Sequence, residues 1–539
     1  EDTNRQRTVL TSANISVRAR LMQGLDLTAQ YAIDYMSSHE DYYTSSLTPG
    51  AIDSNGTAKG YSRRADASYI NWTNVESLNF DRSFNTVHHV SALAGIELKS
   101  RKYNTLSGSG SGFMNDNIQE ITYSDENSRN AESSVSTTRK MSFIGRAVYS
   151  YDSRYYASFN IRRDGSSDFG EFSKWSNFWS AGLSWNINRE SFFHNEKISL
   201  LKLKASYGIS GNSRADVSGA LGTYSYGSSY SYGGASGAII ATVPNPGISW
   251  EKTRMFNFGI RIEIRNAIEL ELQAYDNLTS DLLSSIYVSR TLSSSSIAAN
   301  MGELRNRGIE LDLSSTNLRR GDFLWTTNFN MAHNSNKILK LYNDVPTSYT
   351  TRIWTEGHDS QTWYLVRWAG VDPTDGSPMW YDRNGNLTRT YSTDNRVADK
   401  SRTPILSGGM VNTLSWKNLS LAFQINYRIG GYALGTYASR YFADGYDITG
   451  SNQAVEVYYE RWTTPGQAAA FPKVSQVSTS SGRYSTRFLY NATNFDLSEV
   501  SLTYNFPGRI IDRWKLKGLA VTAVLNNAYL FTPDQKRGR

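Results

Sequence analysis

The histidines are the first residues to consider for catalysis or metal binding. None lies in an HxxxH or HxH spacing, and His88 and His89 are adjacent, so in a strand they would point to opposite faces. An enzyme of the lipase or protease type needs a Ser or an acid beside a His on a common face, and no GxSxG motif supports one. We therefore predict no enzyme, no catalytic residue, no metal and no cofactor. The other histidines are His39, His194, His333 and His358.

Aromatic side chains in two long connections are better candidates for functional residues than the histidines, because they could bind a ligand. Flat rings suit sugar faces by stacking and peptide side chains by apolar contact, while nearby Asn, Asp and Arg orient hydroxyls or termini. The alternative is that these rings pack the loops against each other or against a lid. The candidates are Tyr224, Tyr226, Tyr230 and Tyr232 in one connection, and Trp354, Trp363, Tyr364, Trp368, Trp380 and Tyr381 in another.

The segments before and after these connections show an alternation of apolar and polar residues. Such a period of two predicts strands that are apolar on one face and polar on the other. The alternation recurs along the chain with almost no helical pattern between, which favours an all-β transmembrane antiparallel β-barrel. In residues 25–36 the apolar positions are Leu25, Leu27, Ala29, Tyr31, Ile33 and Tyr35.

About sixteen strands are predicted, joined by connections that alternate between short and long. Short turns on one side of a membrane and long loops on the other are typical of outer-membrane barrels, whereas a soluble sandwich has no reason to place its long loops at one end. The tract 222–237, rich in Ser, Gly and Tyr, is read as a loop tip. The predicted strands are 9–20, 25–36, 69–80, 87–99, 141–151, 154–163, 177–187, 200–209, 254–265, 267–277, 307–315, 322–332, 408–416, 418–429, 494–506 and 518–527.

Composition is compatible with this class. The hydrophobic share is 39% and mean hydropathy is -0.49. Such low hydropathy is compatible with a membrane barrel, because only every second residue of a wall strand faces lipid. The aromatic share of 13% suits rings at both membrane interfaces. The absence of cysteine excludes disulfides and thiolate metal sites. The net charge of +7 comes from scattered Lys and Arg, which argues against nucleic acid; basic outer loops instead suit anionic lipopolysaccharide or an anionic substrate.

The chain ends predict an internal part of a longer barrel. Glu1 is not an initiator Met, and no charged segment followed by an apolar run opens the sequence, so a signal peptide is expected to be absent. After residues 518–527 the chain stops at Lys536–Arg539 without a closing strand, and an open edge in lipid would be costly. We expect residues 1–539 to be one part of a single barrel, with no domain boundary inside them.

Several segments between strands resemble the SusC/RagA-like TonB-dependent outer-membrane transporters. Residues 162–170, RRDGSSDFG, resemble the family's RRDGSSRFG signature, and residues 203–212, LKASYGISGN, resemble LRASYGVTGN. Residues 108–120, GSGSGFMNDNIQE, resemble SGSGFPNDNLQEL. Further segments, at 250–253, 279–283, 306–311 and 460–463, follow in the family's order, so the resemblance covers nearly the whole chain.

The resemblance implies a barrel of about 22 strands with a plug folded inside, a SusD-like surface lipoprotein over the mouth, and energy from TonB acting through the plug. Roughly five strands, together with the plug and the TonB-contacting segment, would precede Glu1, and one strand would follow Arg539. The implied function is import of oligosaccharides or oligopeptides. The rivals are a siderophore or cobalamin receptor without a lipoprotein lid, and an adhesin or enzyme without a plug.

Two further expectations concern charged residues. Many family members carry an acidic, calcium-like loop where this chain has residues 369–377, but Pro373 and the few carboxylates here argue against the six to eight oxygen ligands that Ca²⁺ takes. Charges at alternate strand positions are expected to face the lumen and contact the plug, because exposing a basic side chain to lipid at the midplane costs about 2–4 kcal/mol. These positions are Lys202, Lys204, Arg261 and Glu263.

Overall fold

A computed structural model describes residues 2–48, 59–213, 217–233, 235–287, 296–445, 452–475 and 477–534. The chain divides into two compact units. Unit 1 comprises Glu1–Leu183, Gly208–Lys252 and Leu283–Asn300; unit 2 comprises Ser184–Tyr207, Thr253–Leu282 and Met301–Arg539. The end of the chain at 536–539, used above to predict a missing strand, lies outside the described residues.

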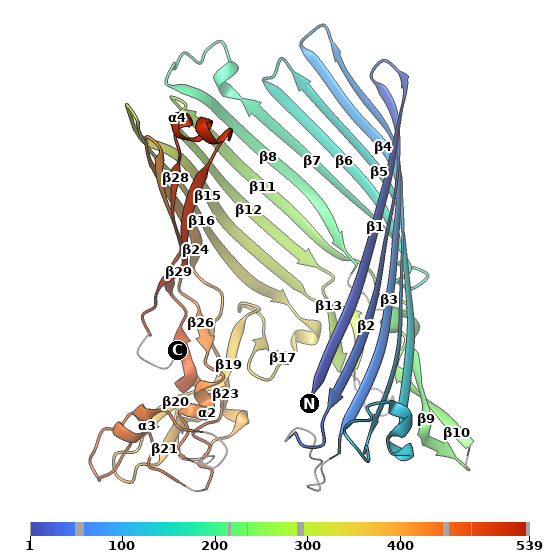
Figure 1. Cartoon of the computed structure of the whole chain (residues 1–539), viewed down its shortest axis with the longest axis vertical. Helices are drawn as coiled ribbons and strands as arrows, with labels where there is room; N and C mark the ends of the chain where they lie inside the picture. Colours follow the sequence, from blue (N-terminus) through green and yellow to red (C-terminus); the bar gives the residue numbers. More distant parts are fainter. Residues whose placement is uncertain are drawn as a thin grey trace. The chain divides into compact units, whose positions relative to one another are not determined.

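Among the described residues, sixteen strands form one antiparallel sheet, in chain order from β1 to β29 (Figure 1). The strands are β1 (Thr3–Met22), β2 (Leu25–Thr44), β3 (Tyr61–Phe84), β4 (His88–Ser111), β5 (Asn130–Tyr151), β6 (Tyr155–Ser166), β7 (Trp175–Asn186), β8 (Ile198–Asn212), β11 (Glu251–Ile264), β12 (Ile268–Ser280), β15 (Glu303–Arg320), β16 (Phe323–Lys340), β24 (Leu406–Trp416), β25 (Leu419–Ile429), β28 (Asn494–Asn505) and β29 (Ala520–Phe531).

Shorter elements fill the long connections. The small sheets are β9 (Thr223–Tyr232) with β10 (Ala235–Thr242), β13 (Leu283–Tyr287) with β14 (Ser296–Asn300), β17 (Thr347–Ser348) with β18 (Ile353–Trp354), β19 (Thr362–Val366) with β23 (Arg396–Ser401), β20 (Trp368–Val371) with β21 (Pro378–Tyr381) and β22 (Leu387–Thr388), and β26 (Tyr432–Leu434) with β27 (Leu489–Asn491). The α-helices are α1 (Val217–Leu221), α2 (Ala438–Tyr441), α3 (Val455–Tyr459) and α4 (Gly508–Ile511).

The remaining helical turns are short 3₁₀ segments. They are η2 (Ile121–Tyr123), η3 (Glu126–Ser128), η4 (Ile187–Arg189), η5 (Tyr342–Asp344), η6 (Thr393–Asn395), η7 (Thr486–Phe488) and η8 (Asp512–Trp514). Within the described ranges, no helix combines the length and apolar character needed to cross a membrane.

All sixteen predicted strands are confirmed, but several of them extend well beyond their predicted ends on the long-loop side. β2 continues to Thr44 and β3 begins at Tyr61, and β4 continues to Ser111 while β5 begins at Asn130. Backbone pairing persists there without an apolar face, so the alternation that revealed the strands stops before the strands do. The tract 222–237, predicted as a loop tip, lies in the long connection between β8 and β11, where it contains most of the β9–β10 hairpin.

The sheet in unit 1 has an apolar face and a polar face, as the alternation predicted. In β2, Leu27, Tyr31, Ile33 and Tyr35 are each 37–48% exposed, while Asp26 on the other face is buried. Directly opposed residues of an antiparallel pair lie on the same face of the sheet. The pairing register therefore shows which residues of each neighbouring strand lie on the apolar face and which on the polar face. We call the face of Ile33 the apolar face.

Short turns at the other strand ends use left-handed backbone conformations. Asp152 and Ser153, between β5 and β6, have φ of 48° and 53°, and Arg265 and Asn266, between β11 and β12, have φ of 51° and 52°. Two successive residues with positive φ match the right-handed twist of paired strands and allow tight hairpins. These turns confirm the predicted short connections.

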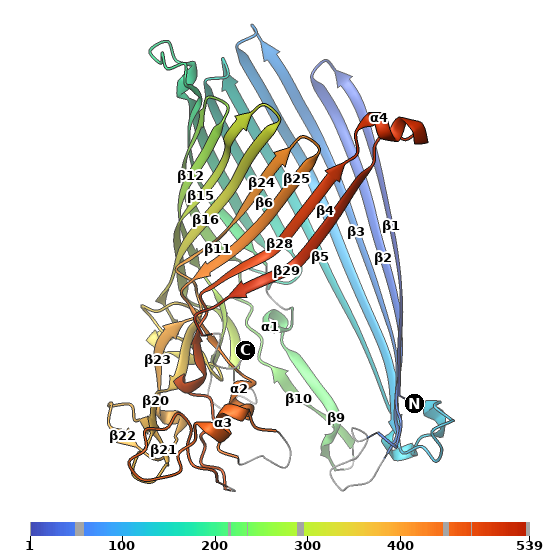
Figure 2. The same cartoon turned by 60° about the vertical axis from the view of Figure 1, so that its left-hand side comes forward.

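Buried apolar clusters lie in the connections on the long-loop side. In unit 1, Phe169, Phe178, Ile248 and Trp250 form one cluster, in which the Phe169 and Trp250 ring centroids are 4.8 Å apart. In unit 2, the second cluster consists of Ala438, Phe442, Val457 and Phe488. The connection between β25 and β28 thus folds around a core of its own, below the ends of the wall strands β24, β25 and β28 (Figure 2).

Candidate functional site

The long connections of unit 2 contain six of the predicted ligand aromatics. These connections comprise β17 to β23 between β16 and β24, and β26, α2, α3 and β27 between β25 and β28. Figure 2 shows β20, β21, α2 and α3 gathered together below the wall strands. The two connections touch, because the backbone N–H of Trp368 donates to the Thr486 hydroxyl at 2.9 Å.

Two of the six rings are buried inside these loops. Trp363 is 8% exposed, and its Nε1 donates to the Tyr432 carbonyl at 2.9 Å. Trp380 is 1% exposed and contacts Trp368 and Tyr391 edge-on, with centroids 5.7 and 5.6 Å apart. Both side chains pack the loops against each other, which was the alternative to ligand contact.

The other four are half-buried and lie against other loop side chains. Tyr364 and Tyr381 each carry an arginine over the ring, Arg396 at 4.9 Å and Arg367 at 5.6 Å from the centroids. Trp354 lies edge-on to Tyr349, with centroids 6.1 Å apart. Each keeps part of its surface open for a ligand.

The four predicted tyrosines of unit 1 lie on β9. Tyr224 and Tyr226 are two residues apart in the regularly paired part of the β9–β10 hairpin and share one face, whereas the register shifts between Gly227 and Tyr232. They are the most exposed of the predicted ligand aromatics: Tyr224 is 62%, Tyr226 76%, Tyr230 38% and Tyr232 92% exposed. Because the two units are described separately, the tyrosines and the unit 2 aromatics form two distinct candidate surfaces.

A hollow of about 390 Å³ beside Trp368 is the clearest candidate site in unit 2. Apolar and aromatic side chains dominate its lining, with one arginine and two glutamates. The lining residues used below are Trp368, Phe471, Phe488, Arg487, Glu456 and Glu460.

Arg487 is held inside an aromatic cage. Its guanidinium carbon lies 4.8 Å from the Trp368 centroid, 5.4 Å from that of Phe471 and 5.2 Å from that of Phe488. Nη1 donates to the Ser481 carbonyl at 3.1 Å, whereas Nη2 is buried and has no hydrogen-bond partner among the described residues. Burial lowers the pKa of Arg487 to about 10, which still leaves it fully charged at neutral pH.

A caged guanidinium with a donor to spare is suited to an anionic or carbonyl oxygen. Hydrogen bonds from charged donors are about twice as strong as neutral ones, and aromatic walls exclude competing water. The sequence analysis selected Trp368 but missed Arg487. The sequence carries only a weak signal for it, a single arginine before Phe488 in a connection that has no periodicity.

The loop 369–377, which corresponds to the calcium-like loop of the resemblance, pairs its carboxylates with the side chain of Arg389. Asp372 accepts from the Thr374 amide at 2.9 Å and from its hydroxyl at 2.6 Å, and it pairs with Arg389, which also lies 3.4 Å from Asp375. These hydrogen bonds, with Arg389 after Thr374, lower the pKa of Asp372 to about 2. In the part of the chain that is described, no three His, Asp or Glu side chains are grouped to hold a metal ion.

In unit 1, the connection that resembles SGSGFPNDNLQEL is fastened to the end of β2. Asp116 accepts from the Tyr43 hydroxyl and the Ser45 hydroxyl at 2.7 Å each, and from the Ser46 amide at 3.0 Å. These hydrogen bonds, led by that from the Ser46 backbone, hold the pKa of Asp116 well below its usual range. The motif thus acts as a clasp that keeps the loop against the strand end.

Charged residues on the wall form ion pairs between strands, either adjacent strands or strands with one other strand between them. Lys204 and Glu271 are 2.6 Å apart and Arg261 and Glu269 are 2.5 Å apart, both in unit 2. Arg162 in unit 1 lies 3.0 Å from Glu97. These partners lie within the wall itself; the expected contact with a plug stays a prediction.

The family described as TonB dependent receptor-like, beta-barrel, matches residues 1–527. Among curated relatives, TonB-dependent receptor P39 of Formosa agariphila is 27% identical, with 96% of this chain and 54% of the relative covered. TonB-dependent receptor SusC of Bacteroides thetaiotaomicron is 26% identical over 74% of this chain and 42% of its own length. The chain spans about half the length of the curated relatives it matches.

Solved structures agree with the sequence relatives. The RagAB peptide transporter is matched with a TM-score of 0.87 and 26% identity, covering 100% of this chain and 59% of that chain. The RagAB peptide importer in its 'open-open' state is matched with a TM-score of 0.88 over 98% of this chain and 58% of that one.

Proposed function

The chain belongs to the TonB-dependent receptor-like β-barrel family, and we propose from this membership that the full-length protein imports nutrient oligomers, either oligosaccharides or oligopeptides. The barrels of this family lie in the outer membrane of Gram-negative bacteria, and they are receptors and transporters. Import would be energised by TonB acting on a part of the protein that precedes this chain.

The observation that best supports oligomer import is the similarity to the RagAB peptide importer over the whole chain. At 26% identity and a TM-score of 0.87, both the wall and the order of the long connections are shared. Those connections carry half-buried and exposed aromatic side chains and the caged Arg487. A surface of that kind can contact several units of an oligomer at once.

We propose that the hollow beside Trp368 contacts the cargo. Rings such as Trp368 offer faces to sugars or apolar peptide side chains, and the free Nη2 of Arg487 offers a donor to a carboxylate or carbonyl. Glu456 and Glu460 at the same hollow would accept from hydroxyls or an amino group. Both cargo classes carry such groups.

The partner in this proposal is a SusD-like surface lipoprotein that covers the mouth. The half-buried rings Trp354, Tyr364 and Tyr381 and the exposed tyrosines of β9 supply apolar surface that a lid or a cargo would cover. Lipid and lipopolysaccharide surround the wall, and nucleic acid is not expected as a partner.

The experiment is co-purification of the full-length protein from outer membranes in mild detergent, followed by mass spectrometry of everything bound. We expect a lipoprotein at one copy per barrel, together with an oligosaccharide or oligopeptide. A barrel that carries neither, and that binds an iron chelate or cobalamin instead, would overturn the proposal in favour of a receptor without a lid.

A further inference from the structure

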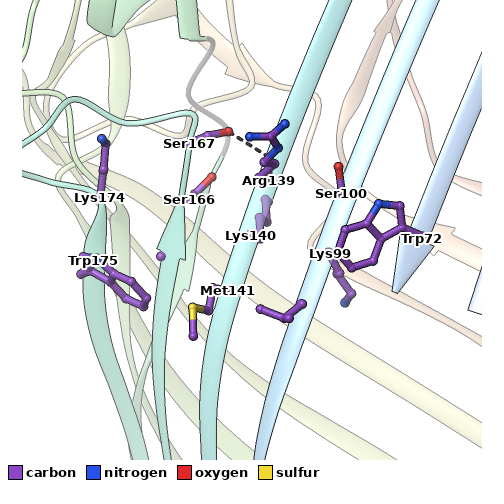
Figure 3. A pocket seen from close by; sticks show the side chains of 12 residues that line it. Trp72, Lys99, Ser100, Arg139, Lys140, Met141, Ser166, Ser167, Lys174 and Trp175 are labelled. Atoms are coloured by element: carbon purple, nitrogen blue, oxygen red, sulfur yellow. Dashed lines mark hydrogen bonds between the residues drawn. The ribbon is translucent and has the colours of Figure 1, made fainter. Parts of the chain in front are cut away.

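A hollow of about 340 Å³ opens on the wall of unit 1, across strands β3 to β7 (Figure 3). Its floor is a row of three paired residues on adjacent strands, Leu98, Met141 and Gly165. Trp72 and Trp175 stand on either side of that row, as Figure 3 shows. The hollow is thus a slot between two indoles.

The register places this slot on the apolar face. Trp72 is the direct partner of Ile33, and Trp72 pairs in turn with Ser100. Leu98 lies two residues from Ser100 on β4 and therefore on the same face. Lys99 and Lys140, which also border the hollow, project to the polar face, where they bond Glu97 and Ser213.

One end of the slot is polar and basic. Arg139 pairs with Ser100 one step beyond the floor, in the direction of the long connections, and Ser167 is joined to the Arg139 backbone by two hydrogen bonds of 2.9 Å. The Lys174 carbonyl accepts from the Ser166 amide at 3.0 Å, and Figure 3 shows the side chains of Arg139, Ser167 and Lys174 toward the same end of the slot. Both basic side chains are exposed.

The apolar band of the wall begins at the opposite end of the slot. Beyond the floor, toward the short turns, this face carries Ile96 at 40%, Phe143 at 42% and Ile161 at 49% exposure. Arg163, the partner of Phe143, lies on the same face, with its guanidinium carbon 5.5 Å from the centroid of the Trp175 ring. The slot therefore lies at the border between the lipid-facing band and the part of the wall near the long connections. A basic residue at such a border costs only about 0–1 kcal/mol, and tryptophan is enriched there.

Carboxylates do not neutralise this basic end. Neither Arg139 nor Lys174 forms an ion pair with any described residue. Asp168 is buried and bonds the Ser166 hydroxyl at 3.1 Å, and the exposed Glu171 does not line the slot. Glu76, on the apolar face, lies four residues from Trp72 in the direction of the short turns.

We propose that this slot binds a phosphorylated, acylated lipid of the outer leaflet. The phosphate would meet Arg139 and Lys174, and an acyl chain would lie between Trp72 and Trp175 over Met141. The polarity of the slot matches that of such a lipid, because its charged end points to the long connections and its apolar end into the membrane. This inference uses the outer-membrane location of the family but not the identity of the cargo.

The test uses the full-length protein in detergent with purified lipid A as the probe, measured by native mass spectrometry. We expect one tightly held lipid A per barrel, and at least tenfold weaker retention in the double variant Arg139→Gln/Lys174→Gln. The matched control is Arg319→Gln/Arg320→Gln, which removes the same charge from exposed positions at a short turn of unit 2 and should retain the lipid. Heat-modifiable migration on gels verifies that each variant is folded.

Three results would overturn the proposal. One is equal retention by the double variant and the native protein. Another is equal binding of lipid A from which the phosphates have been removed, since the basic end would then have no role. The third is displacement of bound lipid A by millimolar inorganic phosphate alone, since the acyl chain would then contribute nothing. The lipid experiment does not measure import. A failure of the oligomer-import proposal would therefore leave the expected retention of lipid A unchanged.

Discussion

Gly165 lies under the indole of Trp175, and a Cβ at Gly165 would come within 2.9 Å of three atoms of that ring. The ring also lies near Phe143, with centroids 6.0 Å apart, and under the guanidinium of Arg163 at 5.5 Å. The RRDG motif therefore divides its residues between two faces. Arg162 and Asp164 pair at 2.6 Å on the polar face, while Arg163 and Gly165 hold Trp175 on the apolar face.

The variant Gly165→Ala tests this contact. The added methyl group must displace Trp175, and overpacking of this kind typically costs about 1–3 kcal/mol. We expect a lower unfolding temperature, a shift in tryptophan emission and weaker retention of lipid A. The control is Gly227→Ala, because a Cβ there meets nothing within 4 Å. Unchanged stability and emission in Gly165→Ala would show that Trp175 is not fixed by this glycine.

The variant Arg487→Met tests the caged guanidinium in the unit 2 loops. Met keeps much of the apolar volume between Trp368 and Phe488 but removes every donor, so the fold should persist while cargo affinity falls about tenfold, as expected for loss of a charged hydrogen bond. Binding of the co-purified cargo is measured by calorimetry. Arg483→Met, an exposed arginine four residues earlier, is the control. If both variants bind alike, the hollow beside Trp368 is not a cargo contact.

The pairing of Asp372 with Arg389 gives the loop 369–377 a defined pH dependence. The pKa of Asp372 is about 2 in the folded loop and about 3.9 in an unfolded chain, so the carboxylate stabilises the loop above about pH 4. That contribution is lost as the pH falls from about 4 to about 2. We expect proteolysis of this loop by an acid protease to accelerate over that range.

In Arg389→Gln, the pKa of Asp372 should rise toward its usual value, and cleavage of the loop should accelerate at a higher pH than in the native protein. Arg383→Gln, in the same connection, should leave the profile unchanged. Identical profiles in the native protein and Arg389→Gln would show that the arginine does not hold this loop.

The clasp at Asp116 predicts local protection of residues 112–120. In Asp116→Ala, the hydroxyls of Tyr43 and Ser45 and the Ser46 amide lose their acceptor, so the loop should detach from the end of β2. We expect cleavage within this loop about tenfold faster under limited proteolysis, with the wall strands still resistant. Glu126→Gln, an exposed acid in the same connection, is the control. Equal cleavage rates would contradict the clasp.

The wall strands could be predicted from the amino-acid sequence. All sixteen strands, their faces and the short turns follow from alternation with period two, because each strand residue points to one face and lipid demands apolar side chains on that face. The SusC/RagA-like resemblance also came from local strings such as RRDGSSDFG, and the family match over 1–527, together with the similarity to SusC and RagAB, confirms it. These features lie within short stretches of chain.

The contacts within the long connections could not be predicted in the same way. No periodicity signals that Trp363 and Trp380 are buried, that Arg389 reaches back 17 residues to Asp372, or that Arg487 is caged by residues as distant as Trp368. The lipid slot likewise takes its side chains from five neighbouring strands. These contacts join residues that are far apart in the sequence. The alternation of apolar and polar residues cannot predict them, because it shows only which face of a strand a residue occupies.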